Sequence, residues 1–145
     1  MSNTIVEYLR MQRQGQSPSP AGNWLNGKLI EAEPGEITVE FEVTQALTNP
    51  VGTLHGGVLS LMADEVIGIA TFSLNNEYMY TSINLSVDFL SKALLGDIVT
   101  VKASVVRRGR NIINVECVIH NQKGKLIGKA TSNMGKTPNK SVFFS

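Results

Sequence analysis

The sequence predicts an α+β fold in which an antiparallel sheet curls around one long, buried helix. Residues 56–73 are apolar without alternation and long enough for a helix of about 27 Å. Stretches on both sides of this segment alternate apolar and polar residues, as half-buried strands do. The apolar face of such a sheet must be covered, and this helix is the one long element available to cover it.

The alternation is clearest in residues 36–43, where Ile37, Val39, Phe41 and Val43 share one face. A Pro-Gly pair before this strand predicts a turn. The expected elements, in order, are a helix at 1–13, a loop at 14–22, strands at 25–33 and 36–43, a loop at 45–54, the helix at 56–73, and a four-strand meander of 78–90, 97–107, 112–120 and 125–135.

Length and composition predict one globular domain, residues 1–145, with 1–22 as an N-terminal helix and loop and 136–145 as a tail. No apolar run reaches the ~20 residues that span a bilayer, and the first residues lack a signal-peptide layout, so a cytoplasmic protein is expected. The single cysteine excludes an internal disulfide framework. Two histidines and one cysteine are too few for a His/Cys zinc site. A carboxylate-bound metal stays open, but nothing in the spacing asks for one, and neither metal nor cofactor is expected.

Charge is divided unevenly along the chain, although the net charge is only +1. Residues 1–90 hold 3 Lys and Arg against 10 Asp and Glu, a balance of −7, and residues 91–145 hold 10 against 2, a balance of +8. The basic part can attract a phosphorylated ligand, or its cations can simply solvate strand faces. No aromatic residues interleave with these cations, so nucleic acid is not expected as a partner.

The segment NPVGTLHGGVLSLMAD, residues 49–64, carries the chemistry. Gly56 and Gly57 open the predicted helix, where glycine lets a ligand approach the backbone closely. Amide N–H groups of a first helical turn lie at the positive end of the helix dipole, which suits a developing negative charge on an acyl oxygen. A glycine pair there can equally be a turn device, and His55 can hold the loop in shape or act as acid or base.

Asp64 lies two turns into the apolar helix, where a carboxylate is costly to bury unless it has a partner or a use. It can bond a neighbouring loop or subunit, or it can act on a substrate. Glu65 lies about 100° around the helix from it and should not share its site. The residues that share the face of Asp64 are small and leave room beside it: Gly57, Ser60, Gly68 and Thr71.

The pattern NPxGTLHGGxxxxxxAD, followed by YTSINLSVDFLSKALLGD and RRGRNI, resembles the phenylacetate-degradation (PaaI-like) family of hotdog-fold acyl-CoA thioesterases. The resemblance covers about residues 25–135. It implies the hotdog fold, a curved antiparallel sheet wrapped around one central helix. It also implies hydrolysis of acyl-CoA, and homodimers that often assemble into homotetramers with active sites between subunits.

The resemblance also implies roles for individual residues. Asp64 matches the catalytic carboxylate, and Gly56 matches the backbone donor that polarises the thioester carbonyl. His55 and Asn49 match loop residues that order the site. Ser82 matches a strand residue that helps to place the attacking water and comes from the partner subunit. Further candidates, for the CoA part of the substrate, are Gly57, Lys92, Arg107, Arg108 and Arg110.

Glu65 departs from the family pattern, because many relatives carry a small or uncharged residue there, so it bears on the acyl pocket. Three other functions compete with this one. A non-catalytic acyl-CoA binding module needs no carboxylate at position 64, and a dehydratase or hydratase needs an Asp and a His paired on one helix. A purely structural oligomer leaves the two glycines without a use. The acyl group, the pathway and the choice between nucleophile and general base for Asp64 stay open.

Overall fold

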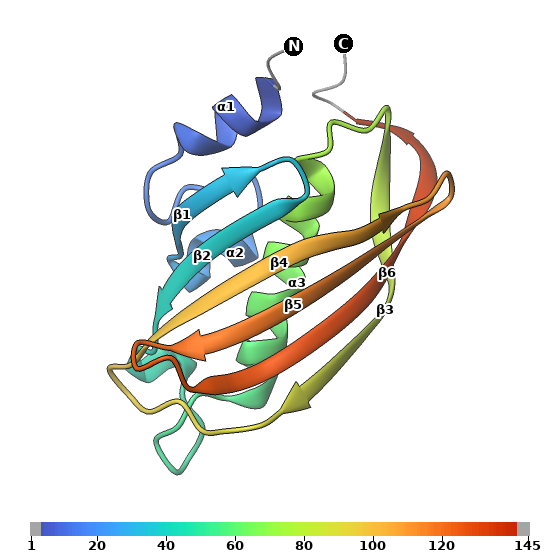
Figure 1. Cartoon of the computed structure of the whole chain (residues 1–145). Helices are drawn as coiled ribbons and strands as arrows, with labels where there is room; N and C mark the ends of the chain where they lie inside the picture. Colours follow the sequence, from blue (N-terminus) through green and yellow to red (C-terminus); the bar gives the residue numbers. More distant parts are fainter. Residues whose placement is uncertain (1–3, 142–145) are drawn as a thin grey trace.

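A computed structural model describes residues 4–141 of the chain. Its six strands form one antiparallel sheet in the order β1-β2-β4-β5-β6-β3 (Figure 1). The strands are β1 (Lys28–Glu33), β2 (Glu36–Glu42), β3 (Tyr78–Phe89), β4 (Ile98–Arg108), β5 (Ile112–Asn121) and β6 (Leu126–Lys140). The helices are α1 (Thr4–Arg10), α2 (Pro20–Leu25) and α3 (Gly56–Phe72), with a 3-10 turn η1 (Gln45–Leu47).

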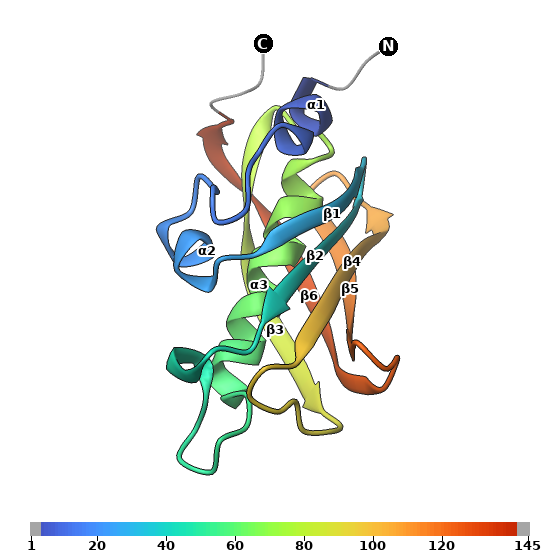
Figure 2. The ribbon, with the colours of Figure 1, turned by 90° about the vertical axis from the view of Figure 1, so that its left-hand side faces the viewer.

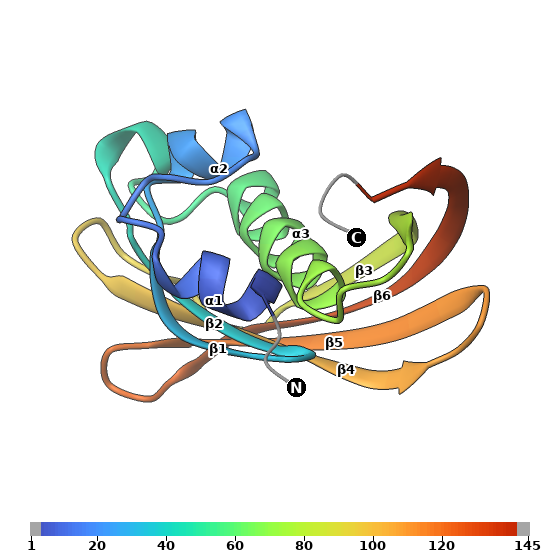
Figure 3. The same ribbon diagram turned by 90° about the horizontal axis from the view of Figure 1, so that it is seen from above.

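The sheet bends around α3, as Figure 3 shows from above, so the predicted α+β fold is confirmed. Met62, Val66 and Ile67 of α3 are fully buried in one core with the apolar faces of the strands. Ser73, just after α3, donates to Ala70 O (2.6 Å) and accepts from the Gly35 amide (2.8 Å). The C-terminal end of the helix is thereby tied to the turn between β1 and β2.

The alternation read from residues 36–43 is also confirmed. Ile37, Val39, Phe41 and Val43 are all buried, with at most 6% of their surface exposed. Strand β2 pairs with β4 over its whole length, from Glu36 opposite Ser104 to Glu42 opposite Ile98.

The expected four-strand meander is wrong in one respect, because β3 does not pair with β4. β3 pairs with β6 and forms one edge of the sheet, while β4 pairs with β2. The connections differ accordingly: residues 109–111 join β4 to β5, but residues 90–97 must carry the chain from β3 across to β4. Only β4, β5 and β6 form a meander.

The two ends of the chain also differ from expectation. Residues 20–25 form α2, where a loop running into a strand was predicted, and β1 begins only at Lys28. Ser19 caps α2 with its side chain, Pro20 occupies the first turn, and Asn26 ends the helix with φ of 57°. The predicted tail is largely strand, since β6 continues to Lys140, which lies opposite Tyr78. Residues 1–3 of the predicted first helix and 142–145 of the tail lie outside the described residues.

Cys117 of β5 is buried with 1% of its surface exposed, and burial raises the pKa of its thiol to about 12. At pH 8 the thiolate fraction is then about one in ten thousand. A thiol-reactive dye is therefore expected to label the native chain slowly and the denatured chain at once, which absorbance of the released dye would measure. Rapid labelling in native buffer would contradict this placement of Cys117.

Within residues 4–141, none of the helices is long and apolar enough to cross a membrane.

Candidate active site

Asp64 and Ser82 meet on the concave side of the sheet, where α3 passes β3. The Ser82 hydroxyl donates to Asp64 Oδ1 at 3.0 Å, and the Asp64 side chain is half-buried. The register of β3 against β6 shifts between Ser82 and Asn84. Such bulges re-aim side chains, and here Asn84 Oδ1 accepts from the Asn133 amide (3.1 Å) at the irregularity. The resemblance implied a Ser82 from the partner subunit, whereas this hydrogen bond forms within one chain.

The N-terminus of α3 is capped by His55. His55 Nδ1 accepts from the Gly57 amide at 2.9 Å, so a neutral His55 carries its proton on Nε2. The carbonyl of His55 accepts from the amides of Val58 and Leu59. His55 therefore holds the start of the helix, and Gly57 has no amide left for a ligand.

Gly56 is the exception in this first turn, because its amide has no hydrogen-bond partner among residues 4–141. A Cβ at Gly56 would lie 3.2 Å from the ring of Phe89, the last residue of β3. The amide is therefore available to a ligand oxygen at the positive end of the helix dipole. The sequence predicted free amides at both glycines, and the structure leaves one.

Asn49 keeps the loop before α3 in shape. Its side-chain oxygen accepts from the amides of Val51 and Thr53, both at 3.1 Å, and its Nδ2 donates to Thr53 Oγ1 at 2.8 Å. One Nδ2 hydrogen remains. The loop is therefore rigid, and Asn49 acts mainly inside it.

A cavity of about 440 Å³ opens beside Asp64 and Ser82. Pockets of this size hold small organic ligands. The wall surface is mostly apolar, although Glu65, Ser19 and other polar residues line it together with the Asp64 carboxylate and the Ser82 hydroxyl. Its apolar lining includes Leu29, Val39, Phe41, Ile69, Phe72 and Met134.

One chain does not bring Gly56 and Asp64 together. They are eight residues apart on α3, which places them about 12 Å apart along the helix axis. A single thioester group cannot contact both. Asp64 and Ser82 thus form one half of the predicted site, and Gly56 with His55 and Asn49 forms the other.

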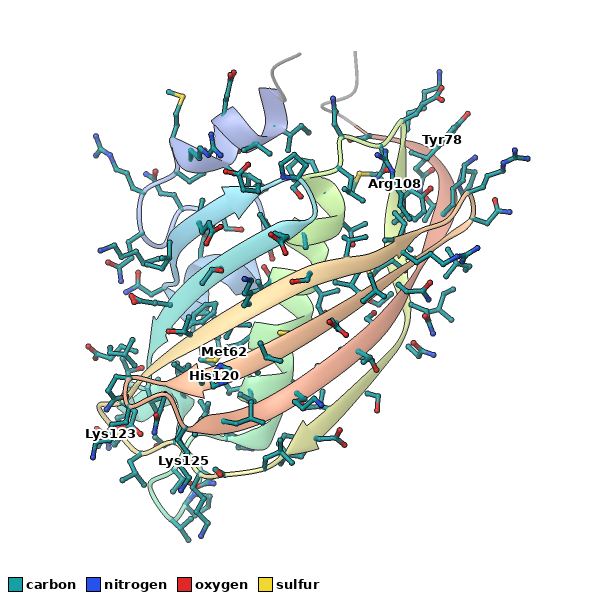
Figure 4. All side chains as sticks on the ribbon, in the orientation of Figure 1. Met62, Tyr78, Arg108, His120, Lys123 and Lys125 are labelled. Atoms are coloured by element: carbon teal, nitrogen blue, oxygen red, sulfur yellow. The ribbon has the colours of Figure 1, made fainter. Side chains whose placement is uncertain are left out.

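The predicted CoA-binding cations also divide. Arg108 and Arg110 line a second cavity of about 330 Å³, together with Lys136, and Tyr80 lines both cavities. Lys92 lies in the connection between β3 and β4, near the start of β4, whereas Arg108 is the last residue of β4. The length of that strand, about 33 Å, separates the two ends. Figure 4 shows Arg108 near the upper end of the sheet, far from Lys123 and Lys125 at the lower end. Arg107 is exposed and does not line this cavity.

The sequence reasoning missed the N-terminal wall of the larger cavity. Residues between Gln12 and Gly22 line it, and Ser19 Oγ donates to Glu65 Oε1 at 2.9 Å. In Figure 2, α2 lies on one side of α3, and β4 and β5 lie on the other side. The signal was the Ser19-Pro20 pair, which is typical of a helix start.

No group of three or more His, Cys, Asp or Glu side chains within residues 4–141 is arranged to hold a metal ion.

The fold class follows from comparison with solved structures. The PaaI protein of the E. coli phenylacetic acid degradation operon matches with a TM-score of 0.81, covering 95% of this chain and 93% of its own. Its identity is 22%, so this match establishes the hotdog-like fold alone.

The chain belongs to the thioesterase superfamily, whose family model matches residues 51–127. Human acyl-coenzyme A thioesterase 13 is 29% identical over 110 residues, 74% of this chain and 79% of that protein. A hypothetical thioesterase protein of Streptococcus pneumoniae TIGR4, solved with coenzyme A, is 28% identical, with a TM-score of 0.75 over 80% of this chain and 89% of its own. The resemblance seen in the sequence is confirmed for family and fold.

Proposed function

We propose that the protein hydrolyses acyl-CoA thioesters to a free acid and CoA, with Asp64 as the carboxylate that drives the reaction. The carrying observation is the Asp64–Ser82 hydrogen bond at the wall of a largely apolar cavity. A relative that is an acyl-coenzyme A thioesterase and one solved with coenzyme A support the substrate class.

The acyl chain lies in the cavity, and its carbonyl oxygen accepts the hydrogen bond of a Gly56 amide. Asp64 takes a proton from a water beside Ser82, or its carboxylate attacks the carbonyl carbon and water then cleaves the anhydride. In both routes a new C–O bond forms, the C–S bond breaks, and the electron pair leaves with the CoA sulfur. The thiolate is a good leaving group and needs little acid assistance.

Gly56 and Asp64 of one chain are about 12 Å apart along α3, so one thioester group cannot reach both, and a site shared between subunits would solve this. We infer that Gly56 of one subunit serves the Asp64 and Ser82 of another. β3 is the edge strand on this side of the sheet, and its exposed apolar residues include Met79, Ile83 and Phe89. A free edge strand is a template for pairing with a second copy.

We infer the level of that pairing from the geometry of α3 and β3. Ser82 lies beside Asp64, and Phe89 lies beside Gly56. A twofold axis at the level of Ser60, midway between Gly56 and Asp64, would bring each Gly56 next to the carboxylate of the partner. Light scattering then separates the dimer from the homotetramer that the resemblance implies.

The second cavity suits the phosphates of CoA, because Tyr80 connects it to the acyl cavity and Arg110 and Arg108 line it. Arg110→Ala is expected to raise KM about threefold at low ionic strength, with a smaller gap in 0.5 M salt, since salt screens exposed charges. Arg108 also donates to Asn76 Oδ1 (2.8 Å), so Arg108→Ala is the second variant. Lys125→Ala, at the far end, is the control. An unchanged KM in both arginine variants would remove this assignment.

Release of CoA thiol from acyl-CoA tests the proposed function. Because the Cys117 thiol is buried, the native protein is expected to add little background to a thiol-reactive dye.

A further inference from the structure

Glu65 lines the same cavity as Asp64, but its carboxylate is bonded to a different element. Ser19, the N-cap of α2, donates to Glu65 Oε1, and the same Ser19 oxygen accepts from the Gly22 amide at 3.3 Å. A Cβ at Gly22 would lie 2.7 Å from Glu65 Oε2. The first turn of α2 therefore rests directly on the Glu65 carboxylate, and glycine at position 22 permits this approach.

Residues 12–22, which we call the wall segment, form one side of the cavity. The segment is bonded to itself and to α2: the Ser19 amide donates to Ser17 Oγ at 3.1 Å, and the Ser17 amide donates to Asn23 Oδ1 in α2. Besides the Ser19–Glu65 bond, the segment is tied to the residues just before β1, since the Gly15 amide donates to Gly27 O at 3.0 Å and Gln14 Nε2 donates to Asn26 O at 3.2 Å. Gln12 Nε2 also donates to Tyr8 O of α1 at 3.3 Å. A segment held together in this way moves as a unit, so one anchor on α3 can fix its position.

The facing side of the cavity is part of the packed core. Val39 and Phe41 come from β2, and Val66 comes from α3, and all three are buried. Packed interiors of this kind do not yield easily. The room for an acyl chain beyond Asp64 therefore depends on where the wall segment lies, beside the exposed β3 residues Met79 and Thr81 that also line the cavity.

We propose that Glu65, by holding Ser19, fixes the wall segment over the cavity and so sets the largest acyl group that the enzyme accepts. Glu65 is a positioning residue in this role, and a bond to a carboxylate is stronger than one between neutral groups. The inference rests on the proposed function, in which this cavity holds the acyl chain. It also gives a use to the residue that departs from the family pattern.

Three variants separate the anchor from other effects. Glu65→Ala removes the acceptor, Ser19→Ala removes the donor, and Glu65→Gln keeps an oxygen that can accept from Ser19. Because Ser19→Ala also removes the cap of α2, the double variant with both alanines behaves like Ser19→Ala alone if the bond is the anchor. Glu65→Gln is the matched control, and its affinity for long relative to short thioethers, the readout described next, is expected to stay within twofold of the wild-type value.

The readout is binding of S-alkyl-CoA thioethers with chains of increasing length, which have no carbonyl to hydrolyse. Wild type is expected to bind them more tightly up to a limiting length and more weakly beyond it. In Glu65→Ala, the affinity for chains beyond that limit, relative to short ones, should rise about fivefold, the factor that loss of one net hydrogen bond represents. Hydrogen exchange in residues 12–22 should be faster in the same variant.

Faster exchange without a change in chain preference, or exchange like that of wild type, would overturn the inference, as would failure of every thioether to bind. The proposed function is tested separately by turnover. If the protein binds thioethers in a chain-dependent way but hydrolyses no thioester, the proposed function is wrong and the role of Glu65 in placing the wall segment stands. If the protein hydrolyses acyl-CoA and Glu65→Ala leaves the chain preference unaltered, the proposed function stands and the role of Glu65 is wrong.

Discussion

Replacing Asp64 by asparagine is expected to lower kcat for acyl-CoA hydrolysis by about a hundredfold or more, the contribution of general base catalysis. Asparagine has nearly the same shape, and its Oδ1 can still accept from Ser82 as the carboxylate does at 3.0 Å. It can neither take a proton from water nor attack the carbonyl carbon. KM should change little, because the acyl chain is held by the apolar cavity and not by the carboxylate.

The control for this variant is Glu116→Gln, which makes the same chemical change at an exposed position of β5. Its turnover should equal that of wild type. Equal melting temperatures of Asp64→Asn and wild type would show that the loss comes from chemistry and not from unfolding. A kcat within threefold of wild type in Asp64→Asn would remove Asp64 from the mechanism.

Gly56→Pro is expected to lower kcat by about a hundredfold to a thousandfold, as loss of one oxyanion donor does. Proline is well suited to the first position of a helix. The extended conformation of His55, with φ of −62° and ψ of 132°, is the one that a following proline requires. The variant therefore removes one N–H group with little cost to the fold.

Gly56→Ala is the matched control, because it adds a Cβ near Phe89 and keeps the amide. Phe89 is 60% exposed and can move aside, so this variant should retain most of its turnover. Equal losses in the proline and alanine variants would mean that the site responds to bulk at position 56 and not to the missing donor.

The two variants together test whether the site is shared. Co-expression of Asp64→Asn and Gly56→Pro chains with different tags should restore about a quarter of wild-type turnover, because half of randomly formed dimers are mixed and each contains one intact site. No recovery in purified mixed dimers would contradict a site shared between subunits.

Local patterns in the sequence predicted most of the fold. The alternation of Ile37, Val39, Phe41 and Val43 reports burial directly, because successive strand residues face opposite sides of a sheet. The long apolar helix was equally plain. The position of β3 was not, since strand order depends on pairing between distant segments. The long connection at residues 90–97 was the one local sign that β3 and β4 do not form a hairpin.

The candidate site was predicted in its residue types but not in its grouping. Asp64 and Ser82 are joined because β3 runs past the middle of α3, which no local pattern reveals. The hydrogen bond from the Gly57 amide to His55 Nδ1 depends on the rotamer of the His55 side chain, which the sequence does not show. The role of Glu65 could not be predicted without α2, because its carboxylate bonds the N-cap of that helix. Ser19 and Pro20 signalled α2, but the helix is too short to show helical periodicity.

The most direct measurement is release of CoA thiol by the wild-type protein across acetyl-, medium-chain, long-chain, phenylacetyl- and benzoyl-CoA. We expect turnover on at least one of these thioesters, with a preference that names the acyl group held in the cavity. No turnover on any of them, with tight binding of CoA ligands, would contradict the account and identify an acyl-CoA binding module on the same fold.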